Sequence, residues 1–238
     1  MRGLKIIGHR GAAGLAPENT LEAIRRGLEL NVHGIEIDVQ LTKDRQVVVI
    51  HDFTVDRTSD GSGEVDQLTL EELRRLDFGA KFHPSFKGER IPTLMEVLQT
   101  VPTDRLLNVE LKQIAYRRRG LEEEVAKVIR HFGQHHHIIV SSFDHRGLKT
   151  IKELLPEIRI GLLTYHYPVN PRSYLEGLGF PVYSLHPAFE LVDREDVKTY
   201  LDMGLEVLSY TVNDPQTARE LESMGVSGIF SDRPDLFV

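Results

Sequence analysis

Short runs of β-branched and leucine residues alternate along this chain with longer segments of helical periodicity. The runs are Lys5–Gly8, Ile35–Leu41, Val47–Ile50, Leu106–Leu111, Ile138–Ser141, Ile160–Leu163, Val182–Leu185, Val207–Val212 and Gly228–Phe230. The amphipathic segments between them include Thr20–Leu30, Glu122–Phe132, His145–Leu155, Arg194–Met203 and Pro215–Met224. Such alternation is typical of βαβ units and of a parallel sheet covered by helices. About eight repeats predict an α/β fold closed into a (β/α)8 TIM barrel, with an open doubly wound sheet as the alternative.

One run exceeds the number of strands in such a barrel, and the spacing of the runs identifies it. Only Thr42–Gln46 separates the second run from Val47–Ile50, whereas a parallel crossover needs about a dozen residues or more. Val47–Ile50 is therefore predicted to fold back as an antiparallel hairpin strand. This hairpin would bring His51 to roughly the level of Asp38 along the sheet.

The segment 53–102 is the longest irregular piece of the chain. It is rich in Asp, Gly, Ser and Lys and contains one short helical stretch, Thr69–Leu76. Loops of this length in compact domains are usually functional lids or small insertions. We expect a small cap inserted at the barrel mouth, after the second strand and its hairpin. No linker or shift in composition divides the chain, so residues 1–238 are expected to form a single domain.

The composition excludes several kinds of protein. Hydrophobic residues make up 40% and charged residues 27% of the 238 residues, which is ordinary globular composition. Because the chain has no cysteine, a disulfide framework, a thiolate zinc site and a cysteine nucleophile are excluded. The formal net charge of −7 disfavours nucleic acid as a partner.

The hydrophobic runs also bear on where the protein acts. They are far shorter than the roughly 20 residues that cross a bilayer, so no stable membrane insertion is expected. Met1–Lys5 leads directly into a predicted strand and leaves no room for a signal-peptide core. We therefore expect a cytoplasmic protein.

Carboxylates occupy one face of two predicted strands. Glu36 and Asp38 alternate with apolar residues, and the two-residue period of a strand places both on the same face. Glu110 and Lys112 share a face in the same way. Carboxylates inside a barrel repel each other and lose hydration unless a cation or a base compensates. The three form a set of hard oxygen ligands suited to Mg²⁺, Ca²⁺ or Mn²⁺, with a buried carboxylate–lysine network as the alternative.

Histidines and cations stand at the ends of neighbouring strands. His9-Arg10-Gly11 ends the first predicted strand, and His51-Asp52 ends the hairpin strand. Active sites of (β/α)8 barrels lie at the C-terminal ends of the parallel strands, where His9 is expected. If the hairpin pairs as predicted, His51 returns to the level of Asp38, so both histidines are expected to border the carboxylates. Histidine titrates near neutrality and commonly acts as a general acid or base. With Arg10 and Lys112 nearby, the group matches an anionic substrate whose leaving oxygen needs a proton, such as a phosphodiester.

A series of ordered motifs gives the chain a resemblance to a known enzyme family. They are His9-Arg10-Gly11, Pro17-Glu18-Asn19-Thr20, Glu36-Ile37-Asp38-Val39, His51-Asp52 with Asp56-Arg57-Thr58, Ile91-Pro92-Thr93-Leu94, Glu110-Leu111-Lys112, Ser141-Ser142-Phe143, Thr211-Val212-Asn213 and Asp232-Arg233-Pro234. Over nearly its whole length the chain resembles a glycerophosphodiester phosphodiesterase, because these motifs follow the order of that family. The cap after His51 also matches an insertion typical of the family.

The resemblance implies metal-dependent hydrolysis of a glycerophosphodiester, a small-molecule substrate, to glycerol 3-phosphate and an alcohol. By this resemblance Glu36, Asp38 and Glu110 are ligands of the divalent cation. The cation is expected to be Mg²⁺ or Ca²⁺, with Mn²⁺ as a further candidate. His9 and His51 correspond to the acid–base pair of the family.

Further residues correspond to substrate contacts in the family. Arg10 and Lys112 correspond to cations that face the phosphate, and Phe143 to an apolar wall for the glycerol. Tyr210 stands where the family often has Trp, and Ser231 replaces a more common Thr. Tyr210 keeps an aromatic face but differs in size and adds a hydroxyl, so the departure bears on substrate fit more than on chemistry.

Two other functions are compatible with such a barrel. A lyase or phospholipase acting on membrane lipids would need an aromatic rim, of which a chain with no Trp and 7% aromatic residues gives no sign. A non-catalytic sensor of glycerophosphodiesters would not need both histidines together with all three carboxylates. The sequence leaves open which histidine is the acid and whether water or the glycerol 2-hydroxyl attacks. It also leaves open the head-group preference and the oligomeric state.

Other polar and aromatic residues have simpler explanations. His135-His136-His137 is predicted to be a solvated turn. Arg117-Arg118-Arg119 is predicted to be a solvated helix start that could steer an anionic substrate at long range. His186 ends a predicted strand and is a weaker candidate for a substrate contact. Tyr165 and Tyr167 follow another strand and are candidates for the barrel mouth.

Overall fold

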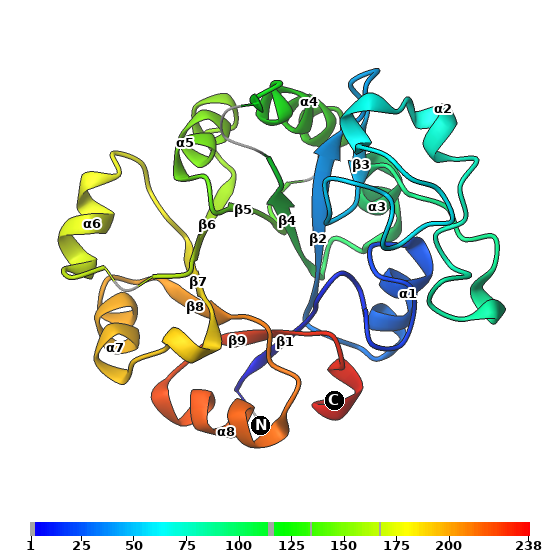
Figure 1. The fold of residues 1–238 in the computed structure, drawn as a ribbon. Coiled ribbons are helices and arrows are strands. Elements are labelled where there is room, and N and C mark those ends of the chain that lie inside the picture. The colour runs from blue at the N-terminus through cyan, green and yellow to red at the C-terminus, as the bar shows by residue number, and fades with distance from the viewer. Residues whose placement is uncertain (1–2, 114–116, 134, 167) are drawn as a thin grey trace.

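The computed structural model describes residues 3–113, 117–133, 135–166 and 168–238 and shows a closed barrel (Figure 1). Within these residues its parallel strands are β1 (Lys5–Gly8), β2 (Gly34–Leu41), β4 (Leu106–Leu111), β5 (Ile138–Ser142), β6 (Arg159–Thr164), β7 (Ser184–Pro187), β8 (Glu206–Ser209) and β9 (Gly228–Ser231). Strand β1 pairs in parallel with both β2 and β9, which closes the sheet on itself. The prediction of a TIM barrel is confirmed, and the open doubly wound sheet is excluded.

Helices cover the outside of the barrel between successive strands (Figure 1). They are α1 (Leu21–Glu29), α3 (Leu94–Thr100), α4 (Leu121–Phe132), α5 (His145–Leu154), α6 (Pro171–Gly177), α7 (Arg194–Asp202) and α8 (Pro215–Met224). Local sequence starts several of them, because the side chains of Thr20, Asp144 and Asp214 accept backbone N–H groups of the first turn. The apolar faces of the helices bury the outward-facing strand residues and form the main core.

Strand β2 shows how polar side chains reach the barrel interior. Its residues Ile35 and Ile37 belong to the main core between the strands and the helices. Glu36 and Asp38 alternate with them and are also buried, so they lie on the opposite, inner face. A separate apolar cluster of Ile7, Ile139, Leu208 and Phe230 comes from other strands of the barrel. The interior is therefore partly apolar packing and partly a polar site.

The short strand β3 (Val47–Val49) lies antiparallel to β2, with Val39 opposite Val49. Beyond the paired residues, the Ile50 N–H donates to the Asp38 carbonyl oxygen at 2.9 Å. The predicted hairpin is confirmed. Because His51 follows Ile50 directly, the hairpin places this histidine beside the carboxyl half of β2.

The chain between β3 and β4 has two parts with different packing. Helix α3 contributes Leu94, Val97 and Leu98 to the main core, so it serves as the crossover helix between β2 and β4. The part before it, residues 53–91, is called the cap segment below. The predicted insertion 53–102 thus includes a helix that packs as part of the barrel wall, because its apolar face meets the strands.

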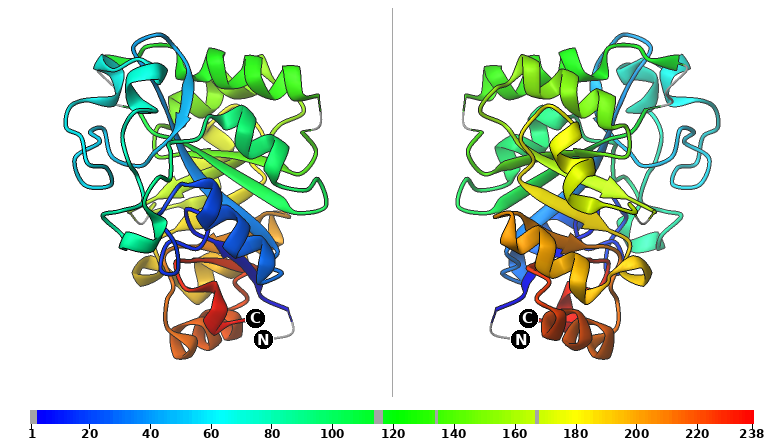
Figure 2. Two further views of the ribbon diagram at one scale, coloured as in Figure 1. Left: turned by 90° about the vertical axis from the view of Figure 1, so that its right-hand side faces the viewer. Right: turned by 90° about the vertical axis from the view of Figure 1, so that its left-hand side faces the viewer.

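The cap segment contains the short helices η1 (Val65–Gln67), α2 (Leu70–Leu73) and η2 (Pro84–Phe86). It has its own apolar cluster, in which Leu73 and Phe78 are packed with Val48 and Ile50 at the end of the hairpin. Figure 2, read with Figure 1, shows this segment at one side of the barrel, next to β2 and β3. The hairpin therefore carries the cap segment and holds it beside the carboxylates.

Some predicted boundaries were wrong by a few residues. The expected strands Val182–Leu185 and Val207–Val212 are Ser184–Pro187 and Glu206–Ser209 in the structure. Val212 is buried in the core without belonging to a strand. Apolar character marks burial here rather than strand pairing, and this explains the shift of the boundaries.

Replacing Leu73 with alanine is expected to loosen the cap segment while the barrel stays folded. Its side chain is fully buried, and a Leu→Ala cavity of this kind costs about 2–5 kcal/mol. Amide hydrogen exchange should accelerate in residues 53–91 and stay slow in the barrel strands. Leu201→Ala, at a side chain exposed by 41%, is the control and should change little. Equal acceleration in the barrel strands would show that cap and barrel unfold as one unit.

Candidate active site

Three carboxylates converge inside the barrel from β2 and β4. Asp38 and Glu110 are partners in the parallel pairing of these strands, and Glu36 precedes Asp38 by two residues on the same face. All three side chains are buried, and one oxygen of each lies within 4.8 Å of the others. The structure therefore brings together the carboxylates that the sequence pattern singled out.

The electrostatics of this carboxylate cluster favour a bound cation. Burial, reinforced by the charges of Asp38 and Glu110, raises the pKa of Glu36 well above its ordinary value. Burial and the charge of Asp38 likewise raise the pKa of Glu110 to about 7. Glu36 Oε1 and Asp38 Oδ1 are buried, and neither has a hydrogen-bond partner within the described part of the chain. Buried carboxylate oxygens without a proton donor fit a hard divalent cation such as Mg²⁺ or Ca²⁺.

Two cationic side chains face the cluster. Lys112 Nζ donates to Glu110 Oε1 at 2.9 Å and lies 3.9 Å from Asp38 Oδ1. Burial opposes the charged form of Lys112, but the carboxylates outweigh this effect and raise the pKa of the lysine. Arg10 Nε lies 3.5 Å from Asp38 Oδ2. With all three carboxylates ionised, Arg10 and Lys112 leave one negative charge uncompensated, and a bound metal ion would neutralise it.

The turn after β1 positions Arg10 and its neighbours. Arg10 adopts a left-handed backbone conformation with φ of 50°, and its N–H donates to Glu36 Oε2 at 2.8 Å. Gly11 follows with φ of 90°, and a Cβ there would lie 2.5 Å from the Ala23 carbonyl carbon. Only glycine fits this turn without strain. The motif His9-Arg10-Gly11 is thus a backbone bend that ties β1 to Glu36.

His9 is oriented by a carboxylate from the other end of the chain. Its Nδ1 lies 2.6 Å from Asp232 Oδ1, and Asn213 Nδ2 donates to the second oxygen of Asp232 at 2.8 Å. An ionised carboxylate only accepts hydrogen bonds, so Nδ1 carries the proton in this contact. His9 Nε2 remains on the side of the cluster, 3.9 Å from Glu36 Oε2.

His51 is oriented in the same manner, by the carboxylate of the residue that follows it. Its Nδ1 donates to Asp52 Oδ1 at 2.7 Å, and its Nε2 accepts from Lys112 Nζ at 3.1 Å. Burial lowers the pKa of His51, which favours the neutral ring. Both histidines therefore hold Nδ1 on a carboxylate and present Nε2 to the site.

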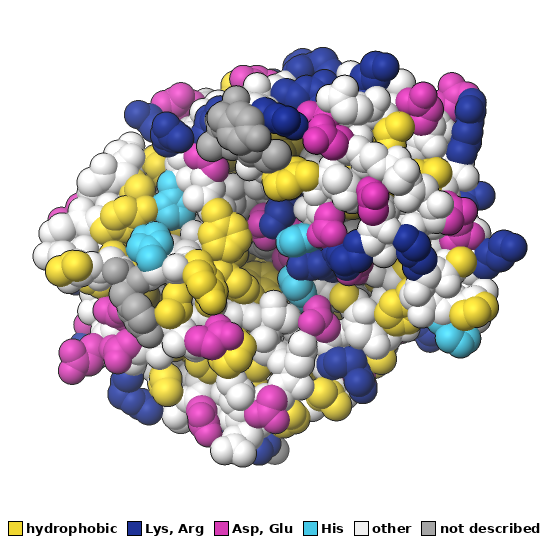
Figure 3. Space-filling view, in the orientation of Figure 1, with side chains coloured by type: hydrophobic (Ala, Val, Ile, Leu, Met, Phe, Trp, Pro, Cys, Tyr) yellow, Lys and Arg dark blue, Asp and Glu magenta, His cyan; other side chains and the backbone are white. Residues whose placement is uncertain are grey.

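Phe143 and Tyr210 stand together at the rim of the barrel. Their rings meet edge to face with centroids 6.0 Å apart, and Phe143 is 48% exposed. The Tyr210 hydroxyl donates to the Thr164 carbonyl oxygen at 3.0 Å. Burial, followed by the charge of Glu110, raises the pKa of this phenol. Figure 3 shows hydrophobic side chains on one side of the central hollow and basic and histidine side chains on the other. The mouth of the barrel thus has an apolar half and a charged half.

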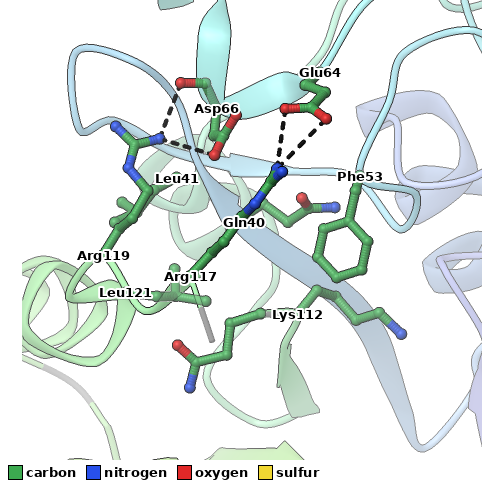
Figure 4. Close-up of a pocket in the computed structure, with 10 residues that line it drawn as sticks. Gln40, Leu41, Phe53, Glu64, Asp66, Lys112, Arg117, Arg119 and Leu121 are labelled. Atoms are coloured by element: carbon green, nitrogen blue, oxygen red, sulfur yellow. Dashed lines mark hydrogen bonds and ion pairs between the residues drawn. The ribbon is translucent and has the colours of Figure 1, made fainter. Parts of the chain in front are cut away.

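A cavity of about 70 Å³ lies beside the site and is lined in part by Lys112 (Figure 4). The side chains of Phe53, Leu41 and Leu121 contribute to its lining. Two ion pairs between the cap segment and the chain before α4 border it, Arg117 with Glu64 and Arg119 with Asp66. The Lys112 side chain lines this cavity while its ammonium is bonded to Glu110.

The structure also shows the surroundings of several weaker candidates for the site. His186 is fully buried, with Nε2 2.8 Å from Ser184 Oγ, so it does not reach a substrate. His137 is buried as well, and the prediction of a solvated turn was wrong for this residue. Tyr165 is 71% exposed beyond β6 and lines an open groove with Phe143. Tyr167 lies outside the described residues.

The run Arg117-Arg118-Arg119 was predicted to be a solvated helix start. It precedes α4, and each of its arginines has an acidic partner, with Arg118 paired to Asp144 and Glu122. Charges paired in this way have a weaker long-range field than free ones, which argues against a role in steering substrate.

Sequence reasoning assigned no role to Asp52, Asp232 or Asn19, although all three lie in the quoted motifs. Asn19 Nδ2 donates to Asp38 Oδ2 at 2.9 Å, and its Oδ1 accepts the Asp38 N–H at 3.2 Å. For Asp232, the position directly after β9 at a strand end was an available signal. Its pairing with His9, 223 residues away, required the closed barrel.

Comparisons with known proteins identify the family of the chain. The model of the glycerophosphoryl diester phosphodiesterase family matches residues 9–236. A glycerophosphodiester phosphodiesterase of Caldanaerobacter subterraneus is 41% identical over 98% of this chain and 96% of its own length. A putative glycerophosphodiester phosphodiesterase of Bacillus subtilis is also 41% identical, with the same coverage of both chains. A solved structure of an Oleispira antarctica phosphodiesterase, in complex with the product sn-glycerol-3-phosphate, is 33% identical with a TM-score of 0.89. It is matched over 98% of this chain and 94% of that one.

The fold, the site and these matches define the class of the protein, which is a phosphoric diester hydrolase built on a TIM barrel. Within this class, the chain belongs to the glycerophosphoryl diester phosphodiesterase family. The resemblance that the ordered motifs indicated is confirmed. None of the helices among the described residues combines the length and apolar character that a membrane span requires.

Proposed function

We propose that this chain hydrolyses small glycerophosphodiesters to glycerol 3-phosphate and an alcohol, in a reaction that depends on a divalent cation and two histidines. The arrangement of the histidines carries the proposal. His9 and His51 come from different strands, and each holds Nδ1 on its own carboxylate. Their Nε2 atoms face a cluster of carboxylates and cations, which is what a charged phosphodiester with a leaving oxygen requires.

Glu36, Asp38 and Glu110 are proposed to hold the cation, which we expect to be Mg²⁺ or Ca²⁺, with Mn²⁺ as a further candidate. The unpartnered buried oxygens of Glu36 and Asp38 support this assignment. Neutralisation of the charge that develops on the phosphate is the chemistry that the cation supplies when bound. The net reaction consumes one water molecule, forms a P–O bond to the attacking oxygen and breaks the P–O bond to the alcohol.

The protein groups share the remaining tasks. Arg10 and Lys112 are proposed to bind phosphate oxygens, which positions the substrate and stabilises charge. One histidine accepts the proton of the attacking oxygen at Nε2, and the other donates a proton from Nε2 to the leaving alkoxide. Lys112 is bonded to His51 Nε2 in this structure, and binding of phosphate by the lysine would free that nitrogen.

Phe143 and Tyr210 are proposed to form the apolar wall against which the glycerol carbons pack. Their edge-to-face contact and the exposure of Phe143 at the rim support this role. We also propose that residues 1–238 act as one unit, because the hairpin joins the cap segment to the barrel through the shared cluster of Val48, Ile50 and Leu73.

The direct test is product analysis over a panel of phosphodiesters with Mg²⁺ or Ca²⁺ present. Glycerophosphocholine, glycerophosphoethanolamine and diglycerophosphate should all release glycerol 3-phosphate as the common product. Bis(4-nitrophenyl) phosphate, which lacks glycerol, serves as the control and should have a lower kcat/KM despite its better leaving group. Accumulation of a cyclic phosphate as the final product would instead identify a lyase. Binding of the diesters without turnover would identify a sensor.

A further inference from the structure

One arginine of the cap segment is bound between two carboxylates that themselves hold residues of the site. Arg57 Nε donates to Asp52 Oδ2 at 2.7 Å, and Nη2 donates to Asp52 Oδ1 at 2.9 Å. Its Nη1 donates to Glu18 Oε2 at 2.6 Å, and Nη2 also donates to Glu18 Oε1 at 2.8 Å. The guanidinium therefore makes two bidentate contacts, one with each carboxylate, which a lysine could not make.

Each carboxylate has a second partner in the site. Asp52 accepts the Nδ1 proton of His51 at 2.7 Å, and Glu18 accepts from Arg10 Nη1 at 2.8 Å. Arg57 thus connects His51 on the hairpin with Arg10 on the turn after β1. We call the set Arg10, Glu18, Arg57, Asp52 and His51 the arginine-linked chain.

Among the described residues, the Arg57 guanidinium alone makes this connection, so its loss should affect both His51 and Arg10. Glu18 and Asp52 share Nη2 of Arg57 as a common donor. Without the guanidinium, the two carboxylates would repel each other. The hydrogen bonds and charge of Arg57 hold the pKa of Asp52 well below its ordinary value, so Asp52 stays an ionised acceptor for His51. The Arg57 side chain is 48% exposed, so its pairs add little to global stability.

We propose that Arg57 is a positioning residue that fixes the orientations of His51 and Arg10 through Asp52 and Glu18. The inference rests on the proposed function, since it assigns these two residues to proton transfer and phosphate binding. Within the described part of the chain, the hydrogen bonds of Arg57 go to Asp52 and Glu18 and not to the three clustered carboxylates. Its effect is therefore expected in the geometry of the site and not in the affinity for the cation.

The first test compares Arg57→Lys and Arg57→Ala with wild type, using Arg74→Ala as the matched control. Arg74 makes an equally exposed double contact with Glu96, away from the site, and its side chain is 43% exposed. Both Arg57 variants should lose on the order of 10²-fold in kcat/KM, because small displacements of reacting groups carry penalties of this size. Arg57→Lys keeps the positive charge but cannot make two bidentate contacts, so its activity should be reduced as in Arg57→Ala. Arg74→Ala should stay within about twofold, and melting temperatures should stay close to wild type in all three.

A second readout separates positioning from a general loss of structure. Guanidinium chloride at non-denaturing concentration should restore part of the activity of Arg57→Ala, with sodium chloride and urea as controls. It should not restore His51→Ala, which lacks the group that is positioned. In addition, glycerol 3-phosphate should bind at least severalfold more weakly to Arg57→Lys, because Arg10 is less well held. The affinity of the metal alone should be unchanged.

The outcomes distinguish this inference from the proposed function. Wild-type kcat/KM in Arg57→Lys would overturn the inference and leave the proposed function intact. Absence of guanidinium rescue in a folded Arg57→Ala would also overturn it. If Arg57→Ala does not fold, the kcat/KM of Arg57→Lys alone tests the inference. If wild type hydrolyses no diester, the proposed function fails, and the inference is then judged by glycerol 3-phosphate binding to wild type and Arg57→Lys.

Discussion

Replacing either His9 or His51 with alanine is expected to reduce turnover of a glycerophosphodiester by ~10²–10⁴-fold, the usual contribution of general acid–base catalysis. Each ring presents Nε2 to the site and is held by a carboxylate at Nδ1. Loss of the ring removes the proton-transfer group and leaves the carboxylate cluster in place. The measurement is kcat at saturating metal for each variant, with His83→Ala as the control. His83 is exposed in the cap segment, so its replacement should have little effect.

The leaving group resolves which histidine is the acid. A nitrophenolate departs without protonation, so the variant that lacks the acid should lose far less activity on 4-nitrophenyl phosphodiesters than on glycerophosphocholine. The variant that lacks the base should lose similar activity on both. A loss below about threefold in either alanine variant would contradict the assignment of that histidine to proton transfer.

Removal of the divalent cation is expected to abolish turnover and to lower the melting temperature together. A cation that binds only the folded protein stabilises it by about 2.7 kcal/mol at a hundredfold excess over Kd. After chelation the three carboxylates repel one another in a poorly solvated pocket. Addition of Mg²⁺ or Ca²⁺ should restore both activity and stability. Scanning calorimetry and a product assay on the same samples measure the two effects.

Glu110→Gln provides a matched comparison for the chelated protein. The pKa of Glu110 is about 7 in the folded state against an ordinary value of 4.5, so the folded protein binds more protons than the unfolded chain between these values. The contribution of Glu110 to stability therefore falls as the pH rises from 4.5 to 7. Chelated Glu110→Gln should gain in melting temperature relative to chelated wild type over this interval. If the variant instead melts well below chelated wild type at pH 7.5, Glu110 is a structural partner of Lys112 rather than a metal ligand.

Much of the barrel could be predicted because its signals are local. The two-residue period of Glu36 and Asp38 reports directly that both face the barrel interior, where the structure has them buried. The short connection Thr42–Gln46 admits only an antiparallel return, and β3 pairs with β2 in that sense. Periodicity and loop length are properties of a single segment, so no tertiary information was needed.

Contacts between distant segments could not be predicted in the same way. Asp232 meets His9 across 223 residues because the last strand closes against the first. Arg57 reaches Glu18 only because the hairpin holds the cap segment beside the first turn. Helix α3 fell inside the predicted insertion 53–102, although Thr93 and Glu96 form a capping box at its start. Partners of this kind depend on register and closure, which no local pattern encodes.

Titration of Mg²⁺ or Ca²⁺ into the metal-free protein by calorimetry tests the central claim most directly, with wild type, Glu36→Gln and His51→Ala compared in one buffer. The account predicts one cation site per chain in wild type and a similar affinity in His51→Ala. It predicts binding at least about tenfold weaker in Glu36→Gln, which removes a charged ligand from the cluster. Unchanged binding in Glu36→Gln, or loss of the site in His51→Ala, would contradict the division of the site into metal-binding carboxylates and proton-transferring histidines.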